Sequence, residues 1–289
     1  TASGKSSFAI KLAKKINGEI INADSMQVYK ELQILTARPR KKDQKNIKHH
    51  LYGFRSAKKF FSTGEWLTLA KKKIKEIQKK NKVPILVGGT GLYFKAITEG
   101  LVKIPKIPLN LRKKVRNFQK KIGQDKFYQK LIKLDPLVKN KINPSDVQRS
   151  IRAYEVKKYS KVSLIDWFKK TDKKFEYDDF LKIYIDFPRS DLIERINKRV
   201  DEMFKNGAIN EVKKFLKLKI KKDKSPNKII GINEVEKFLI KEHDLKTTKE
   251  LISIKTRQYA KRQSTWARGQ MLGWQKIDYK DLVSFLKKI

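Results

Sequence analysis

The first six residues of the chain have the types and spacing of a phosphate-binding loop. They match the second half of the pattern G-x-x-x-x-G-K-[ST], in which backbone N–H groups at a helix N-terminus and a lysine bind phosphate oxygens. Lys5 is that lysine, and the Ser6 hydroxyl is the expected ligand of Mg²⁺. The first glycine and the strand that feeds such a loop fall before Thr1, so we expect the N-terminal strand of the core to be missing. An amphipathic helix over residues 7–16 follows, which favours this interpretation over a chance match.

Two further candidate groups follow short predicted strands. Asp24 comes directly after strand 19–23, and the glycine-rich run 88–91 comes after strand 84–87. Ligands of open parallel sheets bind at the carboxyl ends of strands, so Asp24 is a candidate general base or metal ligand. A turn or helix cap is the alternative. Paired glycines let a substrate approach the backbone closely, or they form only a strand-to-helix turn.

Basic residues are arranged in two patterns that fit a nucleic acid. Arg149 and Arg152 lie three positions apart on a predicted helix and therefore on one face, although most such faces are simply solvated. The stretch 255–268 combines arginine with glutamine, tyrosine and tryptophan, a chemistry suited to phosphate contacts and base stacking.

Composition supports a polyanionic partner and excludes several other classes. The 289 residues include 71 Lys and Arg against 30 Asp and Glu, a formal net charge of +41, although a biased genome composition also enriches lysine. With no cysteine, disulfides, thiolate zinc sites and a cysteine nucleophile are excluded. The adjacent His49 and His50 favour a structural role. With no apolar run near the roughly 20 residues of a membrane span and no secretory signal, we expect a soluble, cytoplasmic protein.

The order of the predicted elements indicates an interrupted α/β core. Strand, loop and helix alternate up to about residue 97, basic helical stretches fill 105–179, and strand character returns at 182–187 before a helix capped by Ser190 and Asp191. We therefore expect a P-loop NTPase-like parallel sheet core over 1–107 and 180–289, with a helical C-terminus. A mostly helical insertion over 108–179 completes the predicted fold.

These segments in this order resemble the tRNA dimethylallyltransferase (isopentenyltransferase) family, and the resemblance spans nearly the whole chain. The matching stretches are TASGKS, DSMQVYKELQILTARP, HHLYGF, PILVGGTGLYFKAI, LDP with NPSDVQRSIRAYEV, RVDEM with NGAINEV, IIGINE and QYAKRQSTWAR. The resemblance implies a fold similar to nucleotide kinases, with the loop turned from ATP to a prenyl diphosphate. The implied reaction moves the dimethylallyl group of dimethylallyl diphosphate to N6 of the adenosine 3′ of the anticodon, in tRNAs that read U-initial codons.

The resemblance also implies roles for individual residues. Asp24 is the implied base and Thr90 lies beside the reacting amine, while Arg199 is our choice for an arginine that binds the leaving group. The implied diphosphate site, with Mg²⁺ near Ser6, consists of Thr1, Ala2, Ser3, Gly4, Lys5, Ser6 and Arg199. The implied tRNA contacts are Asp24, Ser25, Met26, Gln27, Thr90, Arg112, Gln148, Arg149, Ser150, Ile151 and Arg152, so that the insertion binds the anticodon arm.

Departures and alternatives accompany this hypothesis. Because the first loop glycine is absent, we expect the chain as it stands to be inactive or unstable; we also expect a monomer. IIGINE has Ile232 and Asn233 where relatives carry tyrosine and a basic residue, and Arg38 replaces a lysine.

The alternative functions are a P-loop kinase, prenyl transfer to free adenine nucleotides, and a non-enzymatic RNA-binding module. The first does not explain the basic aromatic stretch, the second does not need a charge of +41, and the third leaves the phosphate loop without a role.

Overall fold

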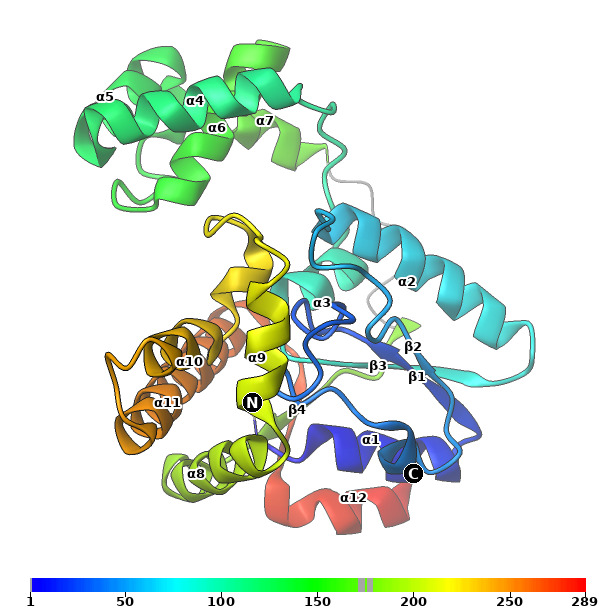
Figure 1. Cartoon of the computed structure of the whole chain (residues 1–289). Coiled ribbons are helices and arrows are strands. Elements are labelled where there is room, and N and C mark those ends of the chain that lie inside the picture. Colours follow the sequence, from blue (N-terminus) through cyan, green and yellow to red (C-terminus); the bar gives the residue numbers. More distant parts are fainter. Residues whose placement is uncertain (1, 171–174, 176–178) are drawn as a thin grey trace. The chain divides into compact units, whose positions relative to one another are not determined.

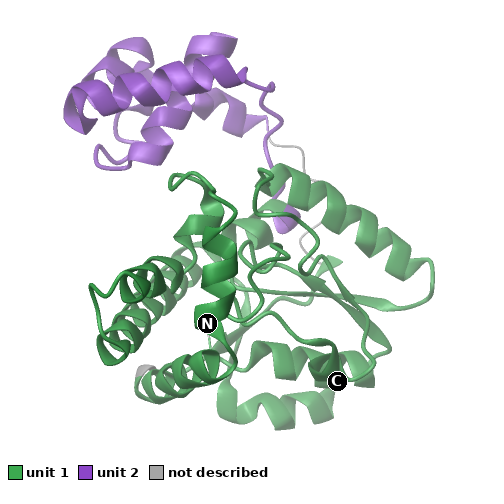
Figure 2. Cartoon of the chain, in the orientation of Figure 1, with its two compact units in different colours: residues 1–96, 178–289 green, residues 97–177 purple. Residues whose placement is uncertain are grey.

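The computed structural model describes residues 2–170, 175 and 179–289, and the chain divides into two compact units. Unit 1 comprises residues 1–96 and 178–289, and unit 2 comprises residues 97–177 (Figure 2). Unit 2 thus begins before the predicted start of the insertion at residue 108. The reason is packing, because Ile104 and Ile107 join the apolar core of unit 2.

Unit 1 opens with alternating helices and strands, continues after unit 2 with helices, and ends in a strand and a short helix (Figure 1). Its elements are, in chain order, α1 (Lys5–Lys15), β1 (Gly18–Asn22), η1 (Lys41–Gln44), β2 (His49–His50), α2 (Thr63–Gln78), β3 (Val83–Val87), α3 (Gly91–Thr98, whose last two residues fall in unit 2), β4 (Ile183–Asp186), α8 (Arg189–Lys205), α9 (Ala208–Leu216), η4 (Ser225–Lys228), α10 (Ile232–Leu239), α11 (Leu245–Gln270), β5 (Gln275–Asp278), η5 (Tyr279–Asp281) and α12 (Leu282–Lys288).

A parallel three-stranded sheet of order β2-β1-β3 forms the centre of unit 1. All five residues of β1 are buried, as expected for a central parallel strand with both faces covered. Helices α1 and α2 pack on this sheet (Figure 1). The predicted parallel α/β core is therefore confirmed. His50 forms an ion pair with the buried Glu19 at 2.6 Å, which confirms its structural role.

The C-terminal part of unit 1 differs from the prediction in two places. It is not wholly helical, because β5 pairs in parallel with β4; a four-residue strand, QKID, carries too little apolar pattern to be recognised. Helix α8 begins at Arg189 with Pro188 as its N-cap, so Ser190 and Asp191 lie inside the first turn and are not the cap. Asp191 instead accepts a hydrogen bond from the Tyr279 hydroxyl at 2.6 Å.

Unit 2 is helical throughout its regular elements in the residues that the structure describes. After the end of α3, these are α4 (Leu109–Ile122), α5 (Gln124–Leu134), η2 (Pro136–Val138), α6 (Val147–Ser160) and α7 (Leu164–Lys169). Helices α4, α5 and α6 pack against one another, and their shared core includes Val115, Phe127 and Ile151. This unit has its own hydrophobic interior, as an independently packed insertion requires.

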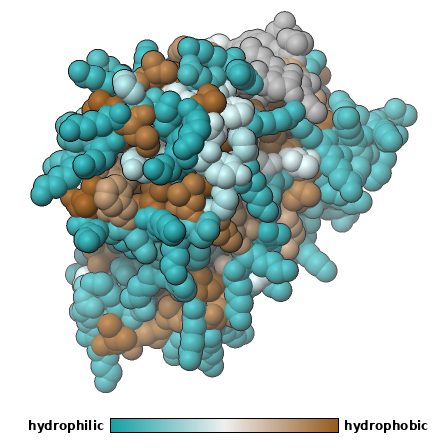
Figure 3. Space-filling model, turned by 90° about the horizontal axis from the view of Figure 1, so that it is seen from above, coloured by the Kyte–Doolittle hydropathy of each residue, from teal (hydrophilic) through white to brown (hydrophobic). Residues whose placement is uncertain are grey.

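The polarity of the surface and of the helices agrees with the high content of charged residues. Hydrophilic side chains dominate the face of the molecule that Figure 3 shows. Among the described residues, no helix combines the length and the apolar character needed to cross a lipid bilayer.

Candidate active site

The phosphate loop ends at the N-terminus of α1, where Gly4 is the N-cap. Its φ of +77° lies in the left-handed region that glycine adopts without strain. Glycine has no side chain with which to cap the helix, and the first backbone N–H groups of a helix have no acceptor within it, so they can bind an anion, which the helix dipole also favours. The predicted diphosphate residue Thr1 lies outside the described residues, whereas Ala2, Ser3 and Gly4 lie on the approach to the helix.

Arg195 on α8 contacts the phosphate loop, and the sequence analysis missed it. Its Nε donates a hydrogen bond to the carbonyl oxygen of Ala2 at 2.9 Å, and its Nη2 lies 3.5 Å from the position of a Cβ added to Gly4. Its guanidinium also stacks over the Phe187 ring at 4.9 Å. Arg195 precedes Arg199 by one helical turn, and that i, i+4 spacing was the available signal.

Three charged groups predicted for the site interact electrostatically in the structure. Burial lowers the pKa of the Lys5 ammonium; the charge of Asp24 opposes this shift and that of Arg199 adds to it. Burial also lowers the pKa of Arg199, again against the charge of Asp24. The Nε of Arg199 is buried and has no hydrogen-bond partner among the described residues. A buried donor without a partner is costly, so this cationic site fits an anionic ligand.

The Asp24 carboxylate is held by its own loop. Its Oδ1 accepts a hydrogen bond from the backbone N–H of Met26 at 2.9 Å, and its backbone N–H donates to Asn22 Oδ1 at 2.9 Å. Its Oδ2 faces the neighbouring loop, 3.6 Å from the position of a Cβ on Gly89. One oxygen is thus committed to the turn, while the other is directed toward the carboxyl end of β3. The turn interpretation of Asp24 is therefore confirmed, and its role as a general base stays a prediction.

The charge of Asp24 acts on three tyrosines from distant parts of the chain. Burial is the main cause that raises the pKa of the Tyr52, Tyr93 and Tyr259 hydroxyls, and the charge of Asp24 raises each of them further, at Tyr93 after that of Tyr29. They therefore stay protonated at neutral pH and can donate hydrogen bonds. The sequence offered no signal for them, because isolated tyrosines are most often core residues.

Thr90 joins the two strand-end loops. Its hydroxyl accepts a hydrogen bond from the Ser25 backbone N–H at 2.9 Å and donates to the Ser25 hydroxyl at 3.1 Å, and its own N–H donates to the carbonyl oxygen of Ala23. Gln27 is turned the other way, and its amide donates to the Thr36 carbonyl oxygen at 2.8 Å. Thr90 and Ser25 thus lie where the loop after β1, which carries Asp24, meets the loop after β3. Gln27 instead supports the loop that follows Asp24.

The glycines after β3 make room for the protein itself. A Cβ on Gly88 would lie 2.0 Å from the Ala23 backbone, and one on Gly91 would lie 2.2 Å from the Trp266 ring. Gln263 donates a hydrogen bond to the Gly89 carbonyl oxygen at 2.7 Å. At Gly88 and Gly91 it is therefore the protein that approaches the backbone closely, which favours the alternative of a strand-to-helix turn for this run. The Gln263 amide and the Trp266 indole lie in the stretch of α11 that was expected to contact RNA, and here they pack against this loop.

The oxygen ligands near the phosphate loop fit a Mg²⁺ ion that is bound partly by the substrate. No group of three or more His, Asp or Glu side chains that could hold a metal occurs among the described residues. Mg²⁺ keeps several waters and is usually bound through one or two protein oxygens together with substrate phosphates. Ser6, exposed in the first turn of α1, and Asp24 are oxygen ligands of that kind. A complete protein cage is not required.

The predicted tRNA contacts in unit 2 divide into surface and interior residues. Gln148, Arg149 and Arg152 keep exposed surface, and the Arg149 side chain is 72% exposed. Ser150 and Ile151 are buried; Ser150 accepts a hydrogen bond from Gln124, and Ile151 packs in the core of the unit. Side-chain contact with tRNA is therefore wrong for these two residues in this conformation. The alternation follows the helical period of α6.

Arg112, the predicted contact on α4, lies 3.6 Å from the carboxylate of Glu155. Its side chain is 30% exposed, whereas that of Glu155 is 1% exposed. The predicted arginine is thus paired with an interior carboxylate that the sequence did not bring to attention.

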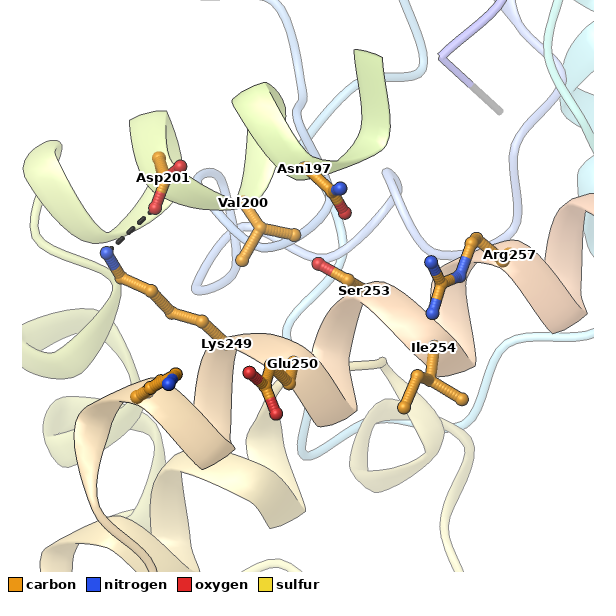
Figure 4. Close-up of a pocket in the computed structure, with 9 residues that line it drawn as sticks. Asn197, Val200, Asp201, Lys249, Glu250, Ser253, Ile254 and Arg257 are labelled. Atoms are coloured by element: carbon orange, nitrogen blue, oxygen red, sulfur yellow. Dashed lines mark hydrogen bonds and ion pairs between the residues drawn. The ribbon is translucent and has the colours of Figure 1, made fainter. Parts of the chain in front are cut away.

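A groove of about 450 Å³ lies between α8 and α11 (Figure 4). Asp201 and Lys249 form an ion pair across it at 2.8 Å, and Ile254 and Arg257 line its other end. Arg257 belongs to the stretch 255–268 that was expected to contact a nucleic acid, but none of the residues predicted for the diphosphate or the reacting base lines this groove, so we assign it no role.

A loop–helix phosphate site and a strand-end carboxylate on a parallel α/β core define an enzyme acting on a phosphorylated substrate. The family model described as IPP transferase matches residues 27–270. The chain is 63% identical over its full length to a tRNA dimethylallyltransferase of Pelagibacter ubique, of which it covers 92%, and 42% identical to one of Rickettsia massiliae, of which it covers 80%. The chain belongs to the IPP transferase family.

Solved structures agree with this assignment. The full-length tRNA isopentenylpyrophosphate transferase of Bacillus halodurans superposes with a TM-score of 0.70 at 31% identity, with 100% of this chain and 92% of that chain covered. A eukaryotic dimethylallyltransferase acting on tRNA gives a TM-score of 0.84 at 28% identity, with 99% and 73% covered. The fold is therefore shared along almost the whole chain.

Proposed function

We propose that this protein transfers the dimethylallyl group of dimethylallyl diphosphate to N6 of the adenosine 3′ of the anticodon, in tRNAs that read U-initial codons. Family membership supports the reaction type. The structural observation that carries the proposal is the shared site of Lys5, Arg199 and Asp24, where two partly buried cations and a carboxylate act on one another. A diphosphate ester and a weakly basic amine need that combination.

The acceptor side of the reaction is assigned to Asp24 and Thr90. The exocyclic amine of adenine is a poor nucleophile, because its lone pair is delocalised into the ring. As the N6–carbon bond forms, Asp24 Oδ2 accepts the N6 proton, while Oδ1 stays hydrogen-bonded to Met26. Thr90, fixed through Ser25, orients the base. The adenosine must leave its stack to reach this site.

The donor side is assigned to the phosphate loop and α8. As the bond between the prenyl carbon and the diphosphate oxygen breaks, the electron pair stays on that oxygen. Lys5, the first N–H groups of α1 and the Arg199 guanidinium stabilise the charge that develops there. Mg²⁺, when bound through Ser6 and the diphosphate, neutralises further charge on the phosphate oxygens.

The second substrate is bound mainly by charge, and unit 2 is proposed to bind the anticodon arm. The exposed Gln148 and Arg149 and the partly exposed Arg152 support this, as does the net charge of +41. We infer in addition that the enzyme works as a monomer in the cytoplasm, where tRNA is used. Light scattering of the purified chain, alone and with tRNA, tests the monomer.

The test of the function uses the chain extended before Thr1 by a family-like strand and the first loop glycine, together with dimethylallyl diphosphate, Mg²⁺ and tRNA transcribed without modifications. This extended chain is the parent chain of the variants below. Mass spectrometry of the digested nucleosides should reveal an N6-prenylated adenosine, and a transcript with guanosine at that position should remain unmodified. Prenylation of free AMP but not of tRNA would contradict the proposed acceptor. If neither tRNA nor AMP were prenylated and the protein instead phosphorylated a small molecule with ATP, the proposed reaction would be contradicted.

A further inference from the structure

Three arginines of unit 2 converge on one interior carboxylate. Arg112 and Arg116 lie one turn apart on α4, and Arg152 and Glu155 lie three positions apart on α6, so that each pair shares a helix face. The Nε atoms of Arg112 and Arg116 are each 3.6 Å from a Glu155 oxygen, and Arg152 Nη1 is 3.7 Å from one. These four residues are called the Glu155 cluster below.

The exposure of the cluster changes sharply from its centre to its rim. The Glu155 side chain is 1% exposed, whereas those of Arg116 and Arg152 are each 40% exposed. The carboxylate therefore lies in the interior of the unit, and the Arg116 and Arg152 side chains reach from it to the surface. Packing fixes this arrangement, because Val115 and Phe118 on α4 contact the same core as Ile151 and Tyr154 on α6.

Arg116 and Arg152 share one carboxylate. Among the described residues, Glu155 is the acidic side chain within ion-pair distance of both. Burial lowers the pKa of Arg152; the charge of Glu155 opposes this shift, and the charge of Arg112 adds to it. Two guanidinium groups on one carboxylate leave a surplus positive charge, and they bring more N–H donors than two carboxylate oxygens accept. A bound anion relieves both conditions, and a phosphate diester matches the planar N–H donors of arginine.

We propose that Glu155 is a positioning residue for tRNA binding, which holds Arg112, Arg116 and Arg152 as one cluster that binds backbone phosphate. This inference rests on the proposed function, because tRNA is the ligand. It adds Arg116 to the contacts expected from the sequence, and it gives an interior acidic residue a part in binding a polyanion.

The sign of one substitution separates positioning from simple electrostatics. Glu155→Gln removes a negative charge from a surface that binds a polyanion, so charge alone predicts tighter tRNA binding. Positioning predicts the reverse, because the guanidinium groups lose the group that gathers them. We expect the KM for tRNA to rise about three- to tenfold, the effect of losing contacts to one or two phosphates, with kcat at saturating tRNA changed less than about twofold. Tighter binding, or an unchanged KM, would overturn the proposal.

A matched pair of exposed substitutions keeps the test independent of folding. Arg116→Ala and Lys114→Ala each remove one positive charge from α4, and Lys114 is an exposed residue outside the cluster. Arg116→Ala should lower the slope of log affinity against log salt concentration by about one unit, with a much smaller change for Lys114→Ala. Equal changes would reduce the cluster to general charge and contradict the inference.

A double-mutant cycle completes the experiment. In the Glu155→Gln background, Arg116→Ala should weaken tRNA binding less than it does in the parent chain, because the contact is already misplaced. Strict additivity would overturn the positioning role. Prenylation of tRNA by the parent chain is measured in the same series. Its absence would contradict the proposed function, whereas normal prenylation with additive mutants would contradict only the role of Glu155.

Discussion

The two units gather cations in different surroundings. In unit 1, burial lowers the pKa of both Lys5 and Arg199, and the Arg199 Nε is buried without a hydrogen-bond partner among the described residues, although both residues are only partly buried as a whole. In unit 2, Arg116 and Arg152 keep 40% of their side-chain surface and Arg149 keeps 72%, while burial lowers the pKa of Arg152 as well. The pair in unit 1 suits one small ligand at a fixed position, whereas the arginines of unit 2 suit a long polyanion held through several weaker contacts.

The difference has an electrostatic consequence. Salt screens exposed charges strongly and buried charges much less. A buried donor such as Arg199 Nε is also preorganised, so it can stabilise developing charge without reorienting. Substitutions in unit 1 should therefore lower the rate, and substitutions in unit 2 should alter affinity and its dependence on salt.

The largest expected effect is at Asp24. Asp24→Ala should lower kcat by about 10²–10⁴-fold, the usual contribution of a general base, while tRNA affinity stays close to that of the parent chain. Single-turnover prenylation and a filter-binding titration measure the two quantities. Near-normal turnover would remove Asp24 as the base and leave it only its turn with Met26.

Arg199 should show the next largest effect. Arg199→Ala should reduce the single-turnover rate by about 10²–10³-fold, as for the loss of one preorganised donor. Arg199→Lys, which retains the charge but not the planar guanidinium, should recover part of the loss. If both variants turn over normally while tRNA affinity falls, Arg199 belongs to the RNA-binding surface and the contrast between the units fails.

The loop after β3 offers a test of packing with a matched control. Gly91→Ala places a methyl group 2.2 Å from the Trp266 ring and should destabilise the protein by about 1–3 kcal/mol through overpacking. Gly269, on the same helix as Trp266, has nothing within 4 Å of an added Cβ, so Gly269→Ala should be neutral or stabilising by up to about 1 kcal/mol. Thermal unfolding compares them, and equal midpoints would contradict the close approach of α11.

The smallest effect is expected at Arg149, whose side chain is 72% exposed and lies 3.4 Å from the Asp146 carboxylate. Arg149→Ala should weaken tRNA binding slightly and reduce its salt slope by about one unit, with kcat unchanged. The readout is a binding titration at several KCl concentrations. An unchanged slope would return this residue to an ordinary solvated surface.

Short sequence patterns predicted those parts of the candidate site that depend on neighbouring residues in the chain. The phosphate loop, the helix after it and the carboxylate Asp24 each lie within a few residues of the strand or helix that positions them. The parallel core followed from the alternation of strands and helices. Arg199 could be anticipated because a diphosphate leaving group needs a cation.

Contacts between distant segments were not predictable in the same way. Arg195 meets Ala2 across most of the chain, and Trp266 fills the space at Gly91 from a helix far along the sequence. The burial of Ile151 depends on how α6 packs in unit 2, which a pattern of charges does not reveal. In each case the tertiary packing decided between a surface and an interior interpretation.

The most direct test of the contrast between the units is tRNA affinity measured against KCl concentration for the parent chain, Arg199→Ala and Arg116→Ala. Arg116→Ala should flatten the slope by about one unit. Arg199→Ala should keep the parent slope although its prenylation rate is strongly reduced. If Arg199→Ala flattened the slope as much as Arg116→Ala, or if neither changed it, the division between a buried diphosphate site and an exposed RNA-binding surface would be contradicted.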